Sequence, residues 1–460
     1  MNVSSIVRQQ RAFFKTGATR SLEFRTTQLR KLLDAILENE SALLGALGAD
    51  LRKSPHDAYL GEVGMVLSEI RHALGNLPLW MKRRRCSVPW IGWPGRGFVQ
   101  PEPYGVVLII GPWNYPLQLV LMPLVGAIAA GNCAVLKPSE FTPHSASALA
   151  GLVRENFSME YITVVEGASE VSEALLQEKF DKIFFTGSSK VGRAVMAAAA
   201  KHLTPVTLEL GGKCPCIVCA DAPLSVTARR IVWGKFMNAG QTCVAPDYVL
   251  VDARVYEDLL EAMKQALNEF YGLDPQQSPN YGRIVNRKHF DRLTGYLKQG
   301  SIYHGGQNDA RDLYIAPTIL TDVSLDSPLM HEEIFGPILP VIKFEDLNSA
   351  LVLVGERPAP LAVYLFTNNR FTRARVVAGT RSGGVCVNDT ILQIMGKDLP
   401  FGGLEESGMG AYHGKTSFDC FTHYRSVLER PFWPDFRLRY RPVSISLITL
   451  KRISRLLMCK

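Results

Sequence analysis

The chain has 460 residues, of which 47% are hydrophobic and 20% are charged. This composition excludes a disordered or fibrous protein and is typical of a globular one with room for two or three domains. The nine cysteines are an odd number spread over a long chain, so we expect free thiols in a reducing cytoplasm rather than a disulfide framework. The net charge of +8 is concentrated in Lys82-Arg-Arg-Arg85 and in the tail. Such clusters are either solvated faces or surfaces for an anionic membrane, and we expect no nucleic-acid partner.

No secretory leader is expected, because the first twenty residues are basic but have no apolar core. The longest apolar stretch, Leu117–Ala130, is shorter than the roughly 20 apolar residues that a membrane span needs. We therefore expect a cytoplasmic protein that at most contacts a membrane at its surface.

The N-terminal part is predicted to be helical. Residues 5–53 are predicted to form polar helices that end in an exposed connector near Ser54-Pro55. Residues 59–80 continue as a helix, because their apolar side chains have helical spacing. Residues 86–101 are rich in Pro, Gly and Trp, so no helix is expected there.

Strands and helices then alternate along the chain. Buried strands are predicted over residues 106–110, 134–136, 162–165 and 182–185, with helices that end near residue 130 and cover 144–157, 170–178 and 190–200. This alternation predicts an α/β fold with a parallel, doubly wound sheet of the Rossmann type, whose ligands bind at the carboxyl ends of the strands. A second α/β series is expected from near Val206 to about residue 384, followed by a glycine-rich arm with a strand near 419–428.

One cysteine stands in an unusual string of residues. In Phe236-Met-Asn-Ala-Gly-Gln-Thr-Cys243 the thiol follows directly on a Gly-Gln-Thr turn. A thiolate is a strong nucleophile and a good leaving group, so Cys243 can add to a carbonyl group and later leave from a thioester. The alternative is a buried structural cysteine, which is the common fate of a free thiol, but the surrounding string favours the nucleophile.

Two polar residues complete this predicted chemistry. Glu209 lies on a Val-Thr-Leu-Glu-Leu strand, and a carboxylate that faces a closed pocket has a raised pKa and can take a proton from water. Asn114 follows the first strand, where its amide can donate to an oxyanion together with the backbone N–H of Cys243. The alternatives are a surface glutamate and a turn asparagine. No histidine lies near these strings, so a Cys–His hydrolase dyad has no local support.

Two further strand ends carry features that suit a nucleotide. Lys137 and Glu140 follow the second strand, where a lysine and a carboxylate suit ribose hydroxyls and Glu140 disfavours a 2′-phosphate. Gly187-Ser-Ser-Lys-Val-Gly192 follows the fourth strand and opens a helix, whose N-terminus around Ser188 can hold a diphosphate. The phosphate loop of nucleotide hydrolases is similar, but it has Lys and Ser or Thr where this chain has Arg193-Ala194.

The remaining nucleotide candidates come from loops. Glu333 and Phe335 belong to an acidic-aromatic turn, in which the carboxylate suits a second ribose and the ring can pack beside a base. Taken alone, this turn would be interpreted as an ordinary loop. Trp113 stands directly before Asn114 and is grouped with the nucleotide-binding residues.

Three cysteines form a compact cluster at positions 214, 216 and 219. Three thiols can bind a metal, but the spacing of Cys214, Cys216 and Cys219 is that of a strand, and no fourth ligand is obvious. We therefore expect core packing and no metal.

Five segments appear in the order that is typical of one family. They are Pro112-Trp-Asn-Tyr-Pro116, Lys137-Pro-Ser-Glu140, Glu209-Leu-Gly-Gly-Lys213, the string that ends at Cys243, and Glu332-Glu-Ile-Phe-Gly-Pro337. One such string would be weak evidence, but five in this order across more than 200 residues do not arise by chance. Over about residues 5–430 the chain resembles the class 3 branch of the aldehyde dehydrogenase superfamily, which includes fatty aldehyde dehydrogenases.

The resemblance implies a Rossmann-type cofactor domain, an α/β catalytic domain and a small β bridging arm. It assigns residues 1–80 and 98–207 to the cofactor domain, 208–384 to the catalytic domain, 81–97 and 385–430 to bridging segments, and 431–460 to a tail. It implies that Cys243 is the nucleophile, Glu209 the general base and Asn114 the contact for the oxyanion.

The resemblance also implies that NAD or NADP is the cofactor. The residues implied to bind it are Trp113, Lys137, Glu140, Gly187, Ser188, Gly192, Glu333 and Phe335. Members of this branch usually form homodimers and often accept NADP as well as NAD, which weakens the inference from Glu140.

The expected reaction is the oxidation of an aldehyde to the carboxylic acid through a thiohemiacetal and a thioester on Cys243. The expected substrate is a medium- or long-chain aliphatic aldehyde, or another apolar aldehyde such as a retinoid or apocarotenoid. Three alternatives stay open. They are acyl transfer to coenzyme A, against which the water-activating Glu209 counts, a thiol-dependent esterase, and a non-catalytic binding protein on the same fold.

The tail carries a predicted amphipathic helix. Its apolar side chains fall at helical spacing, and its basic side chains Lys451, Arg452 and Arg455 lie largely off that face. The apolar positions are Val443, Leu447, Leu450, Ile453 and Leu457. Such a helix suits an anionic membrane surface, or it covers the apolar tunnel of the enzyme or of a dimer partner. Because a C-terminal helix gates the substrate entrance in fatty aldehyde relatives, we expect gating, with peripheral membrane contact as the alternative.

Overall fold

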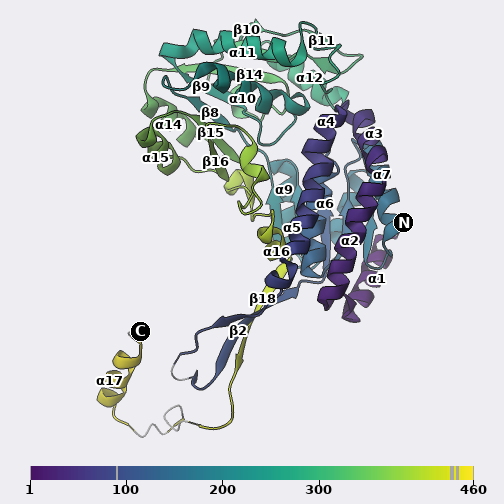
Figure 1. Ribbon diagram of the computed structural model, residues 1–460, viewed down its shortest axis with the longest axis vertical. Helices are drawn as coiled ribbons and strands as arrows, with labels where there is room; N and C mark the ends of the chain where they lie inside the picture. The colour runs from purple at the N-terminus through teal and green to yellow at the C-terminus, as the bar shows by residue number, and fades with distance from the viewer. Residues whose placement is uncertain (1, 90–91, 436–439, 442–444, 459–460) are drawn as a thin grey trace.

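The computed structural model describes residues 2–89, 92–435, 440–441 and 445–458, with side chains described up to Arg455. Val443 and the side chain of Leu457, two positions of the predicted apolar tail face, lie outside the described residues. The chain forms two lobes and an arm that projects from them and leads to the last helix, α17 (Figure 1).

The first lobe is built on a six-stranded sheet with the order β17-β7-β6-β3-β4-β5. All its strand pairs are parallel except that of β17 with β7. The strands are β3 (Val106–Ile110), β4 (Cys133–Lys137), β5 (Ile162–Val164), β6 (Lys182–Thr186), β7 (Val206–Glu209) and β17 (Gly408–Met409). The chain runs outward from β3 to β5 and returns to β6 on the other side of β3. The predicted doubly wound sheet is therefore confirmed, and its switch point, where such sheets bind ligands, lies between β3 and β6.

Helices enclose this sheet. They are α1 (Val3–Lys15), α2 (Leu22–Glu38), α3 (Glu40–Leu51), α4 (Pro55–Ala58), α5 (Gly64–Trp80), α6 (Gln118–Ala130), α7 (Pro143–Asn156), α8 (Ser169–Gln177) and α9 (Ser189–Ala200). Every residue of strand β3 and of helix α6 is buried, as their almost wholly apolar sequences require in the centre of a layered fold. Between α4 and α5, residues Tyr59–Val63 form a π-helical turn, η2.

The connector that was predicted to be exposed after the N-terminal helices is exposed only in part, at Arg52, Pro55 and His56. Lys53 and Ser54 are only 6% and 5% exposed. The reason is that the ammonium group of Lys53 turns inward and forms a buried ion pair with Glu62. A polar residue in a connector is usually solvated, so the sequence alone favoured the exposed position.

The second lobe is built on a seven-stranded sheet with the order β10-β13-β14-β9-β8-β15-β16, parallel except for β10. Its strands are β8 (Pro215–Val218), β9 (Tyr248–Asp252), β10 (Ser301–His304), β13 (Thr318–Thr321), β14 (Ile338–Phe344), β15 (Ala362–Phe366) and β16 (Gly384–Val387). Its helices are α10 (Leu224–Phe236), α11 (Tyr256–Tyr271), α12 (Arg287–Tyr296), α13 (Pro328–His331), α14 (Leu347–Gly355) and α15 (Arg370–Gly379), and a small hairpin pairs β11 (Asn308–Asp309) with β12 (Tyr314–Ile315). This second series starts at β8 and not near Val206, because β7 pairs with β6 in the first sheet.

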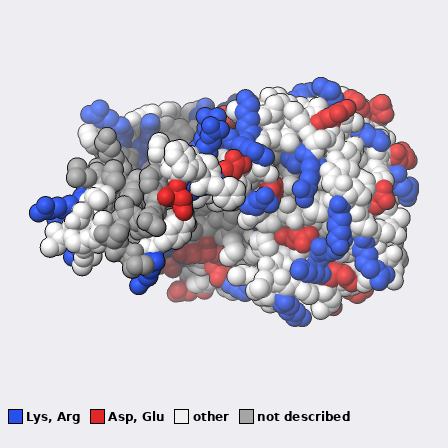
Figure 2. Space-filling view, turned by 90° about the horizontal axis from the view of Figure 1, so that it is seen from below, with Lys and Arg blue, Asp and Glu red and all other residues white. Residues whose placement is uncertain are grey.

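The arm is a three-stranded sheet of β1 (Arg84–Cys86), β2 (Arg96–Pro103) and β18 (Thr422–Glu429). The strand expected near 419–428 begins later than predicted, because Lys415–Cys420 forms helix α16. Seen from below, the basic side chains of the body are mixed with acidic ones rather than gathered in one patch (Figure 2). This mixing is typical of solvated faces.

Helix α17 (Leu447–Met458) lies apart from both lobes, beyond the end of the arm (Figure 1). Leu447 and Ile448 are 65% and 67% exposed. The expectation that the tail covers the tunnel of its own chain is therefore not met, because the arm carries the helix away from the body. None of the helices in the described part of the chain has both the length and the apolar composition that crossing a bilayer requires.

Candidate functional site

The loop that carries Cys243 has an unusual backbone. Asn238 and Ala239 both have a φ of 52°, and Gly240 has a φ of 73°. Residues with a Cβ seldom adopt this left-handed region, and such strain concentrates at functional sites. A Cβ on Gly240 would lie 2.2 Å from the carbonyl oxygen of Gly336. The loop can therefore approach the Gly336 turn only because residue 240 is glycine.

The Cys243 thiol has a strongly perturbed environment. The residue is half-buried and borders a cavity with mostly apolar walls. Burial raises the pKa of the thiol well above its usual range, and the charges of Glu333 and Glu209 raise this pKa further. The thiol is therefore protonated at rest and needs a proton acceptor before it can react as a thiolate.

Glu209 ends strand β7 and is 2% exposed. Neither of its carboxyl oxygens has a hydrogen-bond partner among the described residues. Burial raises the pKa of this carboxyl group well above its usual range. A buried carboxyl group without partners destabilises the fold, which is more typical of a functional position than of a structural one. Such a group is a stronger base than a surface carboxylate and can take a proton from water.

Asn114 comes from the loop after β3, at the switch point of the first sheet, and is 2% exposed. Its side-chain nitrogen donates to the carbonyl oxygen of Gln241 at 3.0 Å, two residues before Cys243. This bond leaves the second hydrogen of the amide nitrogen for a ligand. The fold thus brings together two segments that lie 127 residues apart in the sequence. The arrangement can stabilise an oxyanion that forms beside the Cys243 thiol.

The cavity that Cys243 borders receives residues from both lobes. Tyr115 and Leu119 come from the first lobe, and Trp233 and Met237 come from helix α10 and the loop that follows it. The Tyr115 hydroxyl forms a hydrogen bond of 2.9 Å with the hydroxyl of Thr242. Since aromatic and aliphatic side chains dominate the walls, the cavity suits an apolar ligand.

A second hollow of about 500 Å³ lies beyond the end of β7 and borders Gly211, Gly212 and Glu333. Its volume falls within the roughly 300–1,000 Å³ of ordinary ligand sites. One carboxyl oxygen of Glu333, Oε1, is buried and lacks a hydrogen-bond partner among the described residues. Burial, with the nearby charge of Asp247, raises the pKa of Glu333 to about 8. An orphaned oxygen that borders a roomy hollow fits a ribose hydroxyl as its ligand.

The loop after β6 has the features that a diphosphate site needs. Ser188 caps helix α9 by accepting a hydrogen bond from the backbone N–H of Val191 at 3.4 Å. A Cβ on Gly192 would lie 2.7 Å from the side chain of Leu210, so glycine permits the close approach of helix and strand. The backbone N–H of Gly187 donates to the carbonyl oxygen of Glu209 at 3.0 Å, which ties this loop to the end of β7. The free N–H groups at the start of α9 therefore suit an anion.

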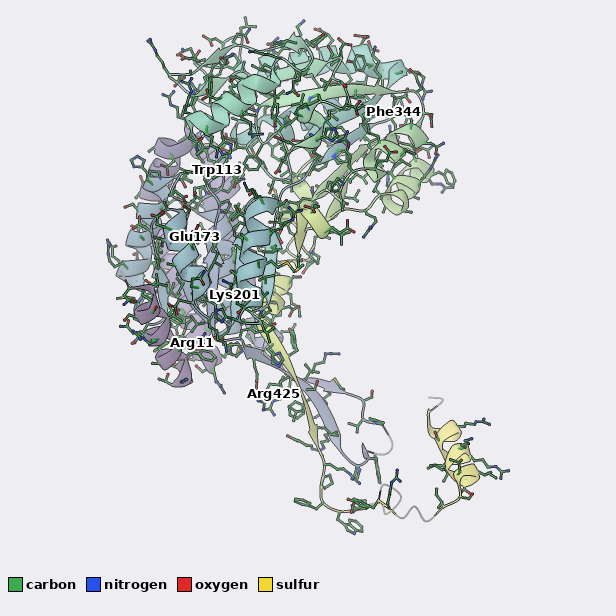
Figure 3. All side chains as sticks on the ribbon, turned by 180° about the vertical axis from the view of Figure 1, so that it is seen from behind. Arg11, Trp113, Glu173, Lys201, Phe344 and Arg425 are labelled. Carbon is green, nitrogen blue, oxygen red and sulfur yellow. The ribbon has the colours of Figure 1, made fainter. Side chains whose placement is uncertain are left out.

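The other predicted nucleotide residues lie at neighbouring positions. Lys137 ends β4, is almost fully buried and pairs with Glu140 at 3.7 Å. Neither of these two residues lines the cavity that Cys243 borders. The rings of Trp113 and Phe335 meet edge to face with centroids 5.2 Å apart, so these two predicted residues from separate lobes are in contact. Trp113 lies where the two lobes meet (Figure 3).

Sequence reasoning missed a polar network behind the Asn114 loop. Lys53 and Glu62 form an ion pair of 2.5 Å whose side chains are 2% and 0% exposed. Lys213 and Asp247 form a second buried pair, which faces Glu333. No local pattern marks such pairs, because a charged residue in a connector or after a strand is usually on the surface.

The cysteine cluster at 214, 216 and 219 surrounds strand β8 in the second lobe. Cys214 and Cys216 are completely buried, whereas Cys219 is partly exposed. The thiol of Cys214 donates to the carbonyl oxygen of Cys243 at 3.5 Å. The first of the three residues therefore packs directly beneath the Cys243 loop.

Comparisons with known proteins identify relatives of the whole chain. A family model described as the aldehyde dehydrogenase family matches residues 1–427. The dimeric NADP-preferring aldehyde dehydrogenase of Rattus norvegicus is 47% identical over 443 residues, which cover 96% of this chain and 98% of the relative. The 4,4'-diaponeurosporen-aldehyde dehydrogenase of Staphylococcus aureus is 48% identical over 420 residues, which cover 91% of this chain and 92% of the relative.

A solved structure also resembles the chain along its whole length. It is described as the substrate-bound state of Staphylococcus aureus AldH, and the TM-score is 0.96 at 45% sequence identity. The match covers 98% of this chain and 100% of that one.

Proposed function

The chain belongs to the aldehyde dehydrogenase family and is an oxidoreductase that converts aldehydes to carboxylic acids with NAD or NADP, and we propose that Cys243, Glu209 and Asn114 carry the reaction. Cys243 acts as the nucleophile, Glu209 as the general base, and Asn114 as a donor to the oxyanion. The observation that supports this proposal is that the half-buried Cys243 thiol borders an apolar cavity, with the orphaned Glu209 carboxyl group close enough to raise the pKa of the thiol and the Asn114 amide bonded to the loop that carries it.

The proposed reaction has four steps. The Cys243 thiol gives its proton to Glu209, which passes it on to solvent, and the thiolate attacks the aldehyde carbon. The oxyanion that forms accepts hydrogen bonds from the Asn114 amide and the backbone N–H of Cys243. NAD or NADP supplies the acceptor for the hydride that leaves this carbon. The acyl group is then held on Cys243 as a thioester. Glu209 takes a proton from water, the water oxygen attacks the thioester, and the acid leaves as the thiolate is restored.

The cofactor residues remain part of the proposal. The diphosphate would be held at the start of α9 by Gly187, Ser188 and Gly192. The helix cap at Ser188 and the close approach of Gly192 to Leu210 support this assignment. Lys137 and Glu140 would hold the adenosine ribose, because their ion pair stands at the end of the neighbouring strand.

The nicotinamide end would lie between the lobes. The orphaned Glu333 oxygen would accept a hydrogen bond from its ribose, and the Trp113 and Phe335 rings would pack around the group. The second hollow, which Glu333 borders, is large enough for such a ligand.

The nucleophile is tested by replacement of Cys243 with alanine. Cys243→Ala is expected to abolish aldehyde-dependent reduction of NAD and NADP while the dissociation constant of the cofactor stays unchanged. Cys86→Ala, a cysteine on the arm, serves as the matched control and should keep full turnover. Retained turnover in Cys243→Ala would refute the assignment.

The proposed substrate is a medium- or long-chain aliphatic aldehyde or another apolar aldehyde, such as a retinoid or apocarotenoid. The apolar walls of the cavity at Cys243 support this class, and one relative is named as a 4,4'-diaponeurosporen-aldehyde dehydrogenase. An aldehyde series of increasing chain length, followed by cofactor reduction, is expected to show kcat/KM rising with length. A preference for short or charged aldehydes would contradict the proposal.

We further propose that the protein is a homodimer in the cytoplasm. The arm and the segment that follows it expose large apolar side chains, Leu428 at 60%, Phe432 at 102% and Trp433 at 83%, and a relative is named as dimeric. The cysteines that the structure describes are free thiols, as a reducing compartment requires. Sedimentation equilibrium is expected to give twice the mass of the chain, and a monomer at micromolar concentration would contradict this.

The tail is proposed to act outside its own lobes. The exposed Leu447 and Ile448, with exposed Lys451 and Arg452, suit the substrate entrance of a dimer partner, with peripheral contact to an anionic membrane as the second candidate. Flotation with anionic vesicles, with and without residues 431–460, separates the two. Binding that depends on the tail would favour the membrane, and absence of binding would favour the partner.

A further inference from the structure

A buried ion pair lies directly behind the loop that presents Asn114. The Nζ atom of Lys53 is 2.5 Å from Oε1 of Glu62, and the two side chains are 2% and 0% exposed. Glu62 belongs to the π-helical turn η2, an uncommon conformation that often occurs at functional sites. The reaction steps proposed above leave this pair without a role.

The other hydrogen bonds of Lys53 and Glu62 connect the pair to the loop that carries Asn114. Lys53 Nζ donates to the carbonyl oxygen of Asn114 at 2.8 Å and lies 3.9 Å from the centre of the Tyr115 ring. The second oxygen of Glu62, Oε2, accepts from the backbone N–H groups of Leu117 at 2.9 Å and Gln118 at 3.2 Å. The pair therefore holds the loop at the Asn114 carbonyl and again at the backbone of Leu117 and Gln118.

A second set of bonds connects the same loop to the Cys243 loop. The side-chain nitrogen of Asn238 donates to the carbonyl oxygen of Asn114 at 2.9 Å and to that of Gln241 at 3.2 Å. The Asn114 amide itself donates to the Gln241 carbonyl oxygen. The Asn114 carbonyl oxygen is thus shared by a lysine on one side and by the nucleophile's loop on the other.

Stability alone does not explain such a pair. Taking two charges out of water costs about as much as their attraction returns, so apolar side chains of similar volume would usually stabilise the fold equally well. However, a buried charge holds its hydrogen-bond partners in one geometry, because displacement of a partner would leave the charge with neither a partner nor water.

We propose that Lys53 and Glu62 are positioning residues that fix the Asn114 amide relative to the Cys243 thiol for oxyanion stabilisation. The proposal rests on the proposed role of Asn114. Displacement of a reacting group by about 1 Å can slow catalysis about 100-fold, so a pair that prevents it has a large effect without touching the substrate.

The test is a double-mutant cycle of Lys53→Met and Asn114→Ala. Asn114→Ala keeps the backbone carbonyl that Lys53 binds but removes the amide, and it should lower kcat by about 100-fold or more. Lys53→Met should lower kcat by about 10- to 100-fold with little change in KM. If Lys53 acts through Asn114, the double variant should be no slower than Asn114→Ala alone.

The rate at which iodoacetamide alkylates Cys243 separates a positioning role from a merely structural one. Damage to the structure of the site would change this rate, whereas loss of the oxyanion contact would not. Displacement at a saturated carbon develops no oxyanion, so the alkylation rate of Lys53→Met should equal that of the wild type. Hydrolysis of a p-nitrophenyl ester does develop an oxyanion and should fall by the same factor as aldehyde oxidation. Lys53→Met/Glu62→Gln, which leaves no unpaired buried charge, repeats the measurements if the single variant does not fold.

Arg11→Met is the matched control. It breaks the part-buried ion pair of Arg11 with Asp181 at 3.1 Å, in the same lobe but far from Trp113 (Figure 3). This variant should keep wild-type kcat and alkylation rate.

Two results would overturn the proposal. One is that Lys53→Met lowers kcat by the same factor in the Asn114→Ala variant as in the wild type. The other is that the alkylation rate of Cys243 in Lys53→Met falls together with kcat. If instead Asn114→Ala keeps full activity, the role of Asn114 itself fails, and this outcome is distinct from both.

Discussion

At the scale of single residues, the site is characterised by carboxyl groups with buried oxygen atoms that lack hydrogen-bond partners among the described residues. Glu209 has no hydrogen-bond partner among the described residues, and Glu333 keeps one oxygen unpaired. Burial raises the pKa of both groups. Each group therefore holds its proton more tightly than a surface glutamate, which suits transfer of protons near neutral pH. Two consequences can be measured.

The first concerns hydrolysis of the thioester. In Glu209→Gln the amide cannot take a proton from water, so we expect kcat to fall by about 100- to 10,000-fold. The acyl group should then accumulate on Cys243 and appear as an added mass in intact-protein mass spectrometry. Glu69→Gln removes another buried carboxylate in the same lobe, and its spectrum should show no adduct. Lack of the adduct in Glu209→Gln would point to a different base.

The second concerns the dependence of stability on pH. The pKa of Glu333 is about 8 in the folded protein and 4.5 in an ordinary glutamate. Because the folded state binds this proton more tightly, the wild type loses stability as the pH rises from about 4.5 to about 8. Glutamine does not titrate, so the Tm of Glu333→Gln relative to the wild type should rise over this window. Thermal unfolding at about pH 5.5 and about pH 8.5 tests this, and a constant Tm difference would contradict it.

At the scale of elements, the site is assembled from strand ends and tight turns. The loops after β3 and β6 flank the switch point of the first sheet, and β7 ends at Glu209. The second lobe contributes one strained loop, which approaches the first lobe through the bond between Asn114 and Gln241. The elements are rigid, so the precision of the site depends on a few turns that only particular residues allow.

Gly240→Ala tests the most constrained of these turns. Alanine at a φ of 73°, with its Cβ 2.2 Å from the Gly336 oxygen, must displace the Cys243 loop. We expect the free energy of unfolding to fall by roughly 1–3 kcal/mol, with loss of most turnover. Gly151→Ala in helix α7 is the control, because a Cβ there meets no atom within 4 Å. It should raise the unfolding free energy by about 0.5–1 kcal/mol, and equal effects of the two variants in denaturant melts would refute the argument.

At the scale of the whole molecule, two α/β lobes meet over the site and an arm carries the tail away from it (Figure 1). The contact of Trp113 with Phe335 and the bond of Asn114 with Gln241 both cross between the lobes. Movement of one lobe against the other would therefore disturb the predicted cofactor and oxyanion contacts together.

Removal of residues 431–460 tests whether the reaction at Cys243 is independent of the tail. None of the described tail residues lines the cavity at Cys243. We therefore expect kcat with a short aldehyde to stay unchanged in steady-state assays, whereas KM for a long-chain aldehyde changes if the tail gates the partner. A large loss of kcat with the short aldehyde would show that the tail supports the chemistry itself.

Much of the fold was predictable from local pattern. Strands such as Val106–Ile110 are unbroken apolar runs between turn residues, and their alternation with helices predicts a parallel sheet. The predicted residues Asn114, Lys137 and Gly187 lie at the ends of such strands, because parallel strands end at one edge of the sheet. The Lys53–Glu62 pair was not predictable, since nothing in a connector's composition shows that its charges are buried.

The sequence by itself determined the α/β architecture, because this depends on the periodicity of apolar residues. It also determined the family, through the resemblance of five motif strings in one order. Only the tertiary structure decided which motifs meet. Asn114 and Gln241 are 127 residues apart, and Lys53 reaches the Asn114 carbonyl across 61. The placement of α17 away from both lobes was also decided at that level. The physical reason is that burial and contact depend on how distant segments pack, which no local pattern encodes.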